Sequence, residues 1–76
     1  MPELKRDQNP MPEDVRAALM KGKLLEAYHA RPPYQRNDYL GWIGAAKQEK
    51  TRAKRLKQML DELAKGGVYM NMKWNG

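Results

Sequence analysis

The side chains in this sequence that could do chemistry are mostly basic, and almost all of the net positive charge lies in one third of the chain. Residues 34–58 contain seven of the fifteen basic side chains but only two of the nine acidic ones. The basic residues of this segment are Arg36, Lys47, Lys50, Arg52, Lys54, Arg55 and Lys57. Such a segregated positive charge attracts phosphates, acidic protein surfaces or anionic lipids. The alternative interpretation is that these side chains only form a well-solvated helix face.

Two of the arginines occupy positions that suggest a more specific site. At helical spacing, Arg36 falls one turn before Leu40 and Arg52 one turn before Leu56, at the edges of apolar stripes. Two planar guanidinium groups could form a cradle for a carboxylate or a phosphate. Alternatively, they could make ion pairs and cation–π contacts inside the domain, because an arginine can bury its stem while its head finds a partner. The partners expected for such an internal network are Asp38, Tyr39 and Trp42.

The other basic residues of the segment point outward on a helix, where they could meet a partner. An acidic protein or a small anionic ligand is the partner that this charge favours. Nucleic acid is the alternative partner, because Arg52, Arg55 and Gln58 are weakly compatible with a recognition helix. No specific signature of a recognition helix is visible, so we predict an interaction module for an acidic partner and keep nucleic-acid binding as the alternative.

The sequence lacks the groups that enzymes use most often. It has no cysteine and one histidine, His29, which excludes thiol nucleophiles and a two-histidine metal site within one chain. It has no glycine-rich phosphate loop, and adjacent acids such as Asp61 and Glu62 do not face each other on a helix. His29 near the end of a helix is expected to interact with the helix dipole. We therefore expect no catalytic residue, no cofactor and no metal, and a protein that is not an enzyme.

The length of the chain, 76 residues and 8.8 kDa, allows one small domain with a thin margin of stability. Hydrophobic residues make up 41% and charged residues 32%, which is typical of a compact domain. No apolar run approaches the roughly 18 residues of a membrane span, and the N-terminus has no apolar signal-peptide region. We therefore expect a cytoplasmic protein without membrane insertion, whereas the oligomeric state is not predicted.

Apolar residues recur at helical spacing through most of the chain, and this predicts an all-α fold. Proline and glycine mark where the helices start and stop, at Pro12, Gly22, Pro32-Pro33 and Gly66-Gly67. The predicted helices cover about residues 12–22, 23–30, 33–47 and 49–65. Three to four short helices with brief connections form a small bundle.

The two ends of the chain differ from this helical middle. We predict a flexible N-terminal tail over residues 1–11, a helical domain over 12–67 and an extended C-terminal segment over 68–76. Apolar residues alternate along the last segment at strand spacing, at Val68, Met70, Met72 and Trp74, yet no second strand is evident for pairing. We expect a strap whose apolar side chains cover part of the core. The alternative is a disordered tail that offers them to a partner.

One stretch of the chain combines residues in a recognisable way. The segment YQRNDYLGWIGAAKQEKTRAKRL at residues 34–56 contains Arg36, Tyr39, Trp42-Ile43, Ala46-Lys47, Thr51-Arg52 and Arg55. This combination resembles the YdeI/OmpD-associated family, also called the bacteriocin-protection family, and the likeness extends over about residues 12–66. Gly41, Gly44 and Lys50 depart from the family pattern, and we interpret both glycines as tolerated in their helix. The resemblance implies a small helical module with an indirect link to the bacterial envelope or bacteriocin tolerance, and it implies no catalytic residue or cofactor.

Overall fold

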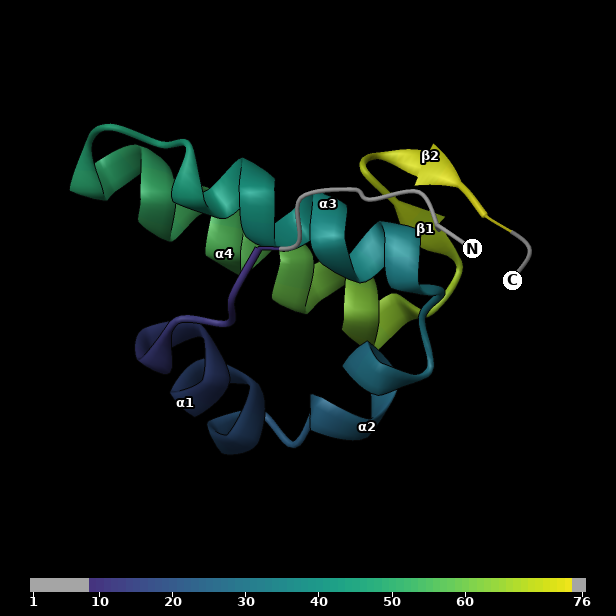
Figure 1. Ribbon diagram of the computed structural model, residues 1–76. Helices are drawn as coiled ribbons and strands as arrows, with labels where there is room; N and C mark the ends of the chain where they lie inside the picture. The colour runs from purple at the N-terminus through teal and green to yellow at the C-terminus, as the bar shows by residue number, and fades with distance from the viewer. Residues whose placement is uncertain (1–8, 75–76) are drawn as a thin grey trace, which may run out of the picture.

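The structure, a computed structural model, describes residues 9–74, which form four helices followed by a two-stranded hairpin. The elements are α1 (Glu13–Lys21), α2 (Leu25–His29), α3 (Pro33–Gly44), α4 (Glu49–Lys65), β1 (Val68–Tyr69) and β2 (Met72–Lys73). Helices α3 and α4 pack along each other, α1 and α2 arch beneath them, and the hairpin follows the end of α4 (Figure 1). The predicted bundle of short helices is confirmed.

Proline and glycine set the ends of the helices, as predicted. Pro33 is the first residue of α3, and Pro32 before it is extended. Helix α4 ends at Lys65, and the Gly66 that follows it has a left-handed φ of 85°. Helix α2 is shorter than predicted because Lys23, with a φ of 59°, cannot be part of a right-handed helix. Helix α3 ends at Gly44, which is earlier than predicted.

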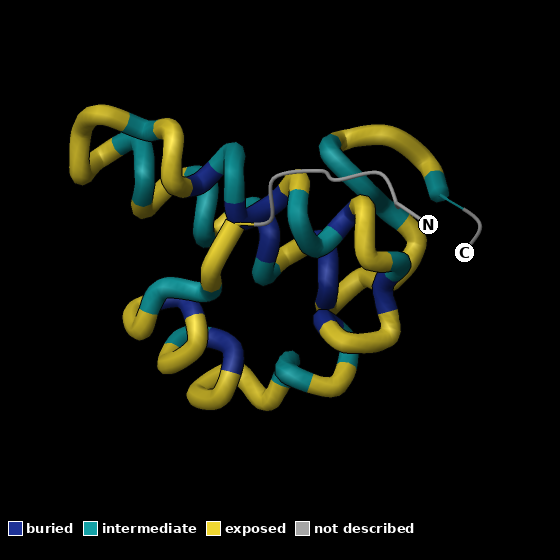
Figure 2. Tube along the Cα trace, in the orientation of Figure 1, coloured by how far each residue is buried: buried dark blue, intermediate teal, exposed yellow. Residues whose placement is uncertain are grey.

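The hydrophobic core lies between α1, α3 and α4, with one aromatic side chain from α2. Its buried members are Val15, Leu19, Tyr28, Tyr39, Leu40, Ile43, Met59 and Leu63. Within each long helix these residues recur about one turn apart, so they share one face, and the buried stretches face the middle of the molecule (Figure 2). Burying one such aliphatic side chain stabilises the fold by about 1.5–3 kcal/mol. Ala53 and Ala64 of α4 are exposed, although they continue the helical spacing of Leu56, Met59, Leu60 and Leu63, so the buried side of α4 is narrower than this spacing suggests.

The C-terminal segment is a β-hairpin rather than a single extended strap. The register of its two antiparallel strands places Val68 opposite Lys73 and Tyr69 opposite Met72. Between the strands, Met70 and Asn71 have φ values of 50° and 66°, as in a two-residue hairpin turn. The expectation that no second strand exists was therefore wrong, because this turn has no glycine to signal it.

The hairpin is docked on the helices, as expected for this segment, but through other side chains. Tyr69 and Met70 pack against the core, whereas Met72 is 58% exposed. Because the turn reverses the chain after Tyr69, the alternating apolar residues no longer share one face. Residues 75–76 lie outside the part of the chain that the structure describes.

The N-terminal segment contacts α3 through Asn9. Residues 1–8 of the predicted tail lie outside the described part of the chain. The backbone N–H of Asn9 donates to Asn37 Oδ1 at 2.7 Å, and its side-chain amide donates to the Asn37 carbonyl at 3.2 Å. A Cβ added to Gly41 would lie 2.9 Å from Nδ2 at the end of the Asn9 side chain, which would have to shift to make room for it. The second glycine of α3 has no described atom within 4 Å of that position.

Candidate functional site

Four exposed lysines lie along α4 and the loop before it. We call this surface the lysine face, and its residues are Lys47, Lys50, Lys54 and Lys57. Lys50, Lys54 and Lys57 are three or four residues apart, so they lie on one side of α4. The loop end of α4, where this row begins, is largely exposed (Figure 2). Lys57 Nζ lies 3.7 Å from Asp61 Oδ2 in an exposed, weak ion pair. Within residues 9–74, no acidic side chain pairs with the other three lysines.

The Arg52 guanidinium is paired with Asp14 of α1 and is not part of this open surface. Arg52 Nε donates to Asp14 Oδ2 at 3.2 Å, and Nη2 donates to Oδ1 at 2.9 Å. The hydrogen bond from Arg52 holds the pKa of the Asp14 carboxyl below its usual range. Neither Asp38 nor Trp42, which the sequence suggested, is the partner. The pair ties the start of α4 to α1, so Arg52 does not form a cradle with Arg36.

Arg55 joins α4 to the end of α3. Its Nη1 donates to the Trp42 carbonyl at 2.6 Å, and its guanidinium carbon lies 5.2 Å from the centre of the Trp42 ring. This carbonyl is among the last four of α3, which lack a full set of helical donors, so Arg55 satisfies it. The expected cation–π contact of Trp42 is thus made by Arg55 and not by Arg52.

Asp38 and Tyr39, the other members of the expected arginine network, contact the hairpin instead. The Tyr69 hydroxyl donates to Asp38 Oδ2 at 2.5 Å. The rings of Tyr69 and Tyr39 meet edge to face, with 5.6 Å between their centres. Burial and the bond to Asp38 raise the pKa of Tyr69, so its hydroxyl stays protonated and can donate. These two residues of α3 therefore serve to dock the hairpin.

Glu62 of α4 is a buried carboxylate, 3% exposed, that accepts hydrogen bonds on both oxygens. Oε1 accepts the Tyr39 hydroxyl at 2.5 Å and the Met70 N–H at 2.8 Å. Oε2 accepts the Asn71 N–H at 2.8 Å and the Gln58 side-chain amide at 3.1 Å. Burial alone would raise the pKa of Glu62, but these hydrogen bonds outweigh burial and hold the pKa below its usual value. The charged carboxylate thus fixes the hairpin turn on the core.

Arg31, 4% exposed, is the second buried charge at this end of the core. Its Nη1 donates to Gln35 Oε1 at 3.0 Å, and its Nη2 donates to the Glu62 backbone carbonyl at 3.0 Å. Its guanidinium carbon lies 4.5 Å from the centre of the Trp74 ring. Arg31 therefore connects the corner between α2 and α3 with the end of α4 and with the residue that follows the hairpin.

Sequence reasoning missed Arg31, Gln35 and Glu62, because polar and charged side chains are expected at the surface. A signal existed for Glu62, which lies one turn after Met59 and directly before Leu63, on the buried side of α4. Arg31 stands between two helices and next to two prolines, where no periodic pattern reports burial.

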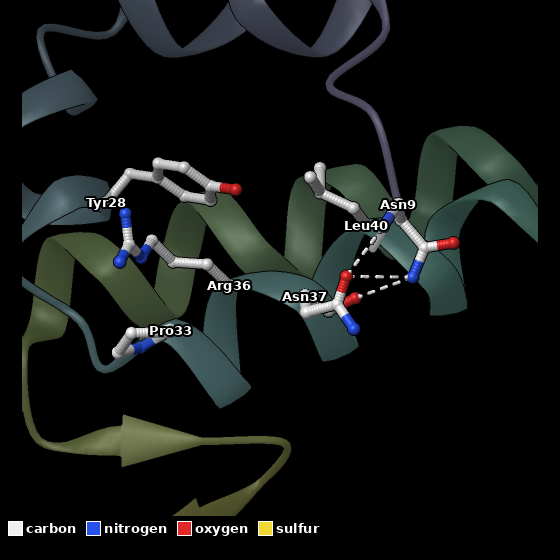
Figure 3. A pocket seen from close by; sticks show the side chains of 6 residues that line it. All are labelled: Asn9, Tyr28, Pro33, Arg36, Asn37 and Leu40. Atoms are coloured by element: carbon white, nitrogen blue, oxygen red, sulfur yellow. Dashed lines mark hydrogen bonds between the residues drawn. The ribbon is translucent and has the colours of Figure 1, made fainter. Parts of the chain in front are cut away.

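A pocket of about 270 Å³ lies between α2, α3 and the N-terminal segment, and Arg36 is one of its walls (Figure 3). The residues that line it are Asn9, Tyr28, Pro33, Arg36, Asn37 and Leu40. In Figure 3 the Arg36 side chain extends from α3 so that its guanidinium lies between Tyr28 and Pro33. The Arg36 Nε is buried and has no hydrogen-bond partner among residues 9–74. We call this the Arg36 pocket.

The described residues offer no metal site and no membrane-crossing helix. Among residues 9–74, no group of three or more histidine or acidic side chains lies close enough together to hold a metal ion. None of the helices in the same range is both long and apolar enough to cross a bilayer.

Comparison with known protein families identifies the helical part of the chain. A family model described as bacteriocin-protection, YdeI or OmpD-associated matches residues 9–66. The match includes all four helices, and with them the lysine face and the Arg36 pocket, and it ends before the hairpin. The resemblance seen in the sequence is thereby confirmed. No curated protein and no solved structure matched in the corresponding comparisons.

Proposed function

Since the chain belongs to the bacteriocin-protection, YdeI or OmpD-associated family, we propose that it is a non-catalytic interaction module that binds an acidic protein through its lysine face. The observation that supports this most is the row of exposed lysines, of which Lys47, Lys50 and Lys54 have no acidic partner within residues 9–74. From Lys50 to Lys57 the row extends about 10 Å along the helix. Carboxylates spaced along a partner's helix or strand match such a row.

The lysine face suits a protein partner better than nucleic acid. Arg52 and Arg55, the residues with a planar fork for bases and phosphates, already bond to Asp14 and to the Trp42 carbonyl. The basic side chains that remain exposed on this surface are lysines. They are flexible point charges that accelerate association, and their attraction weakens as the salt concentration rises. In this proposal, the module contributes to bacteriocin protection by occupying an acidic surface of another protein.

The experiment is a titration of the isotope-labelled full chain with an acidic helical peptide, followed by amide resonance shifts. We expect the shifts to cluster around Lys50 and Lys54 and to weaken as salt is raised from about 50 to 200 mM. The double variant Lys50→Gln/Lys54→Gln should bind several-fold more weakly. The control Lys65→Gln/Lys73→Gln removes the same charge from exposed lysines elsewhere and should bind like the natural chain.

A parallel titration with a short DNA duplex distinguishes the alternative function. Three available lysines would give duplex binding a slope of about −3 in log affinity against log salt. If the duplex binds more tightly than the acidic peptide at the same residues, the proposal is wrong and the nucleic-acid module takes its place. Equal loss of peptide binding in both double variants would also contradict it, because net charge alone would then explain the affinity.

A further inference from the structure

We propose that the Arg36 pocket is a binding site for a carboxylate group on a short aliphatic stem, independent of the lysine face. The pocket lies toward the α2 end of the α3–α4 pair, whereas the lysine face lies at the other end, beside the loop between α3 and α4 (Figure 1). The two sites therefore do not share residues, and the outcome of a test on one leaves the other standing.

Arg36 brings to this pocket a buried nitrogen for which the described residues supply no acceptor. Its Nε is the one buried side-chain nitrogen or oxygen without a partner among residues 9–74. Elsewhere the fold satisfies its buried charges fully, as Glu62 and Arg31 show. Folded proteins leave few buried polar atoms unpaired, and the exceptions often mark a place for a ligand or an ion. An acceptor supplied from outside would complete this guanidinium.

Apart from Arg36, the described residues that line the pocket are uncharged. Among residues 9–74, no acidic side chain lines the pocket, so none of the described residues there neutralises the positive charge of Arg36. Tyr28 is 3% exposed, and its burial raises the pKa of its hydroxyl. The positive charge of the nearby Arg36 opposes this rise. Pro33 and Leu40 add apolar surface. A carboxylate could thus meet the fork while its stem packs on the apolar walls.

The size and the charge of the pocket favour a carboxylate over a phosphate. About 270 Å³ is just below the range of about 300–1,000 Å³ typical of ligand pockets, so one small acid or one acidic side chain fits. Within the described part of the chain, Arg36 is the one basic residue among the walls of the pocket. One guanidinium balances the single charge of a carboxylate, whereas a phosphate monoester has up to two charges and would stay partly uncompensated in a half-buried site.

The experiment is a titration of the isotope-labelled full chain with sodium propionate, compared with sodium chloride at the same ionic strength. We expect saturable amide shifts at Tyr28, Arg36 and Leu40 that chloride does not produce. Arg36→Met should weaken propionate binding by about tenfold or more, and Arg36→Lys, which keeps the charge without the fork, should weaken it less. Arg16→Met, which replaces an exposed arginine of α1, is the matched control and should bind like the natural chain.

A capped tripeptide with a central glutamate identifies the source of the carboxylate. Tighter binding of this peptide than of propionate, at the same residues, supports an acidic side chain of a protein; the opposite order supports a free organic acid. Methyl phosphate binding more tightly than propionate would overturn the proposal. Shifts that do not saturate, or an Arg36→Met variant that binds propionate as well as the natural chain does, would overturn it too.

Discussion

The Tyr39 hydroxyl donates to the Glu62 carboxylate at 2.5 Å, in the buried contact between α3 and α4. The same carboxylate oxygen accepts the Met70 N–H of the hairpin turn. Hydrogen bonds to a charged acceptor are stronger than neutral ones, and this acceptor is buried with its lone pairs occupied. The contact between two helices and the docking of the hairpin therefore depend on one ionised side chain.

Replacing this carboxylate by an amide tests that dependence. In Glu62→Gln the side-chain amide nitrogen can only donate, yet it would face groups that donate to the carboxylate in the natural chain. We therefore expect the free energy of unfolding to fall by about 3 kcal/mol. Amide exchange at Met70 and Asn71 should quicken, because both N–H groups lose a charged acceptor. Asp61→Asn, the same chemical change at the next position, breaks only an exposed pair with Lys57 and should alter stability by less than about 0.5 kcal/mol. Urea unfolding of both variants gives the comparison, and equal losses would contradict this role of Glu62.

Acid should destabilise the fold by protonating the Glu62 carboxylate. The folded chain holds the pKa of Glu62 below the value of about 4.3 that an unfolded chain shows. The stabilisation is therefore fully present above about pH 4.3 and is lost as the pH falls through the folded pKa. We expect the free energy of unfolding of the natural chain to fall as the pH drops below about 4.3, and to fall less steeply in Glu62→Gln. Urea unfolding at several pH values measures it; parallel curves for the two proteins would show that other carboxyls dominate.

Local sequence signals were sufficient to predict most of the helical fold. Pro33 starts α3 because its fixed φ suits the first helical position, and Gly66 ends α4 because it accepts a left-handed φ. The hairpin was missed because Met70 and Asn71 adopt positive φ without a glycine to indicate a turn. Both of their N–H groups donate to the Glu62 carboxylate, which lies eight and nine residues earlier in the chain.

The candidate site was predictable in its charge and not in its pairing. The lysines of α4 were expected outside and are exposed there. The partner of Arg52 was not predictable, because Asp14 lies 38 residues away in the chain and is brought close only by the packing of α1. Arg36 was a candidate from its type and position, but its pocket depends on Tyr28 and on Asn9, which come from two other segments.

The Arg52–Asp14 pair should contribute little to stability despite its two-point geometry. The Asp14 side chain is 56% exposed, so water and salt screen the attraction. A double-mutant cycle with Asp14→Asn and Arg52→Gln should give a coupling energy of about 0.2–1 kcal/mol that declines at high salt. A coupling above about 2 kcal/mol would show that the pair is a principal tie between α1 and α4.

Arg31 should matter far more to stability than an exposed arginine does. Its fork joins the Gln35 side chain to the end of α4 and covers the Trp74 ring. Lysine cannot reproduce that planar fork, so Arg31→Lys should lower the free energy of unfolding by about 2 kcal/mol. Arg16→Lys, at an exposed position on α1, should stay within about 0.5 kcal/mol of the natural chain. Comparable urea midpoints for the two variants would mean that the buried contacts of Arg31 are energetically weak.

Replacing Arg36, unlike replacing Arg31, should not lower the free energy of unfolding, because the buried Arg36 Nε has no acceptor among residues 9–74. Removing an unpaired buried polar group relieves a desolvation cost, and methionine can occupy a similar volume. In the absence of any carboxylate, we expect Arg36→Met to leave the free energy of unfolding unchanged or to raise it by about 1 kcal/mol. Arg55→Met, which loses the bond to the Trp42 carbonyl, should lower it by about 1–2 kcal/mol. If both variants lose the same stability in urea unfolding, Arg36 is held by the fold itself and its pocket has no need of a ligand.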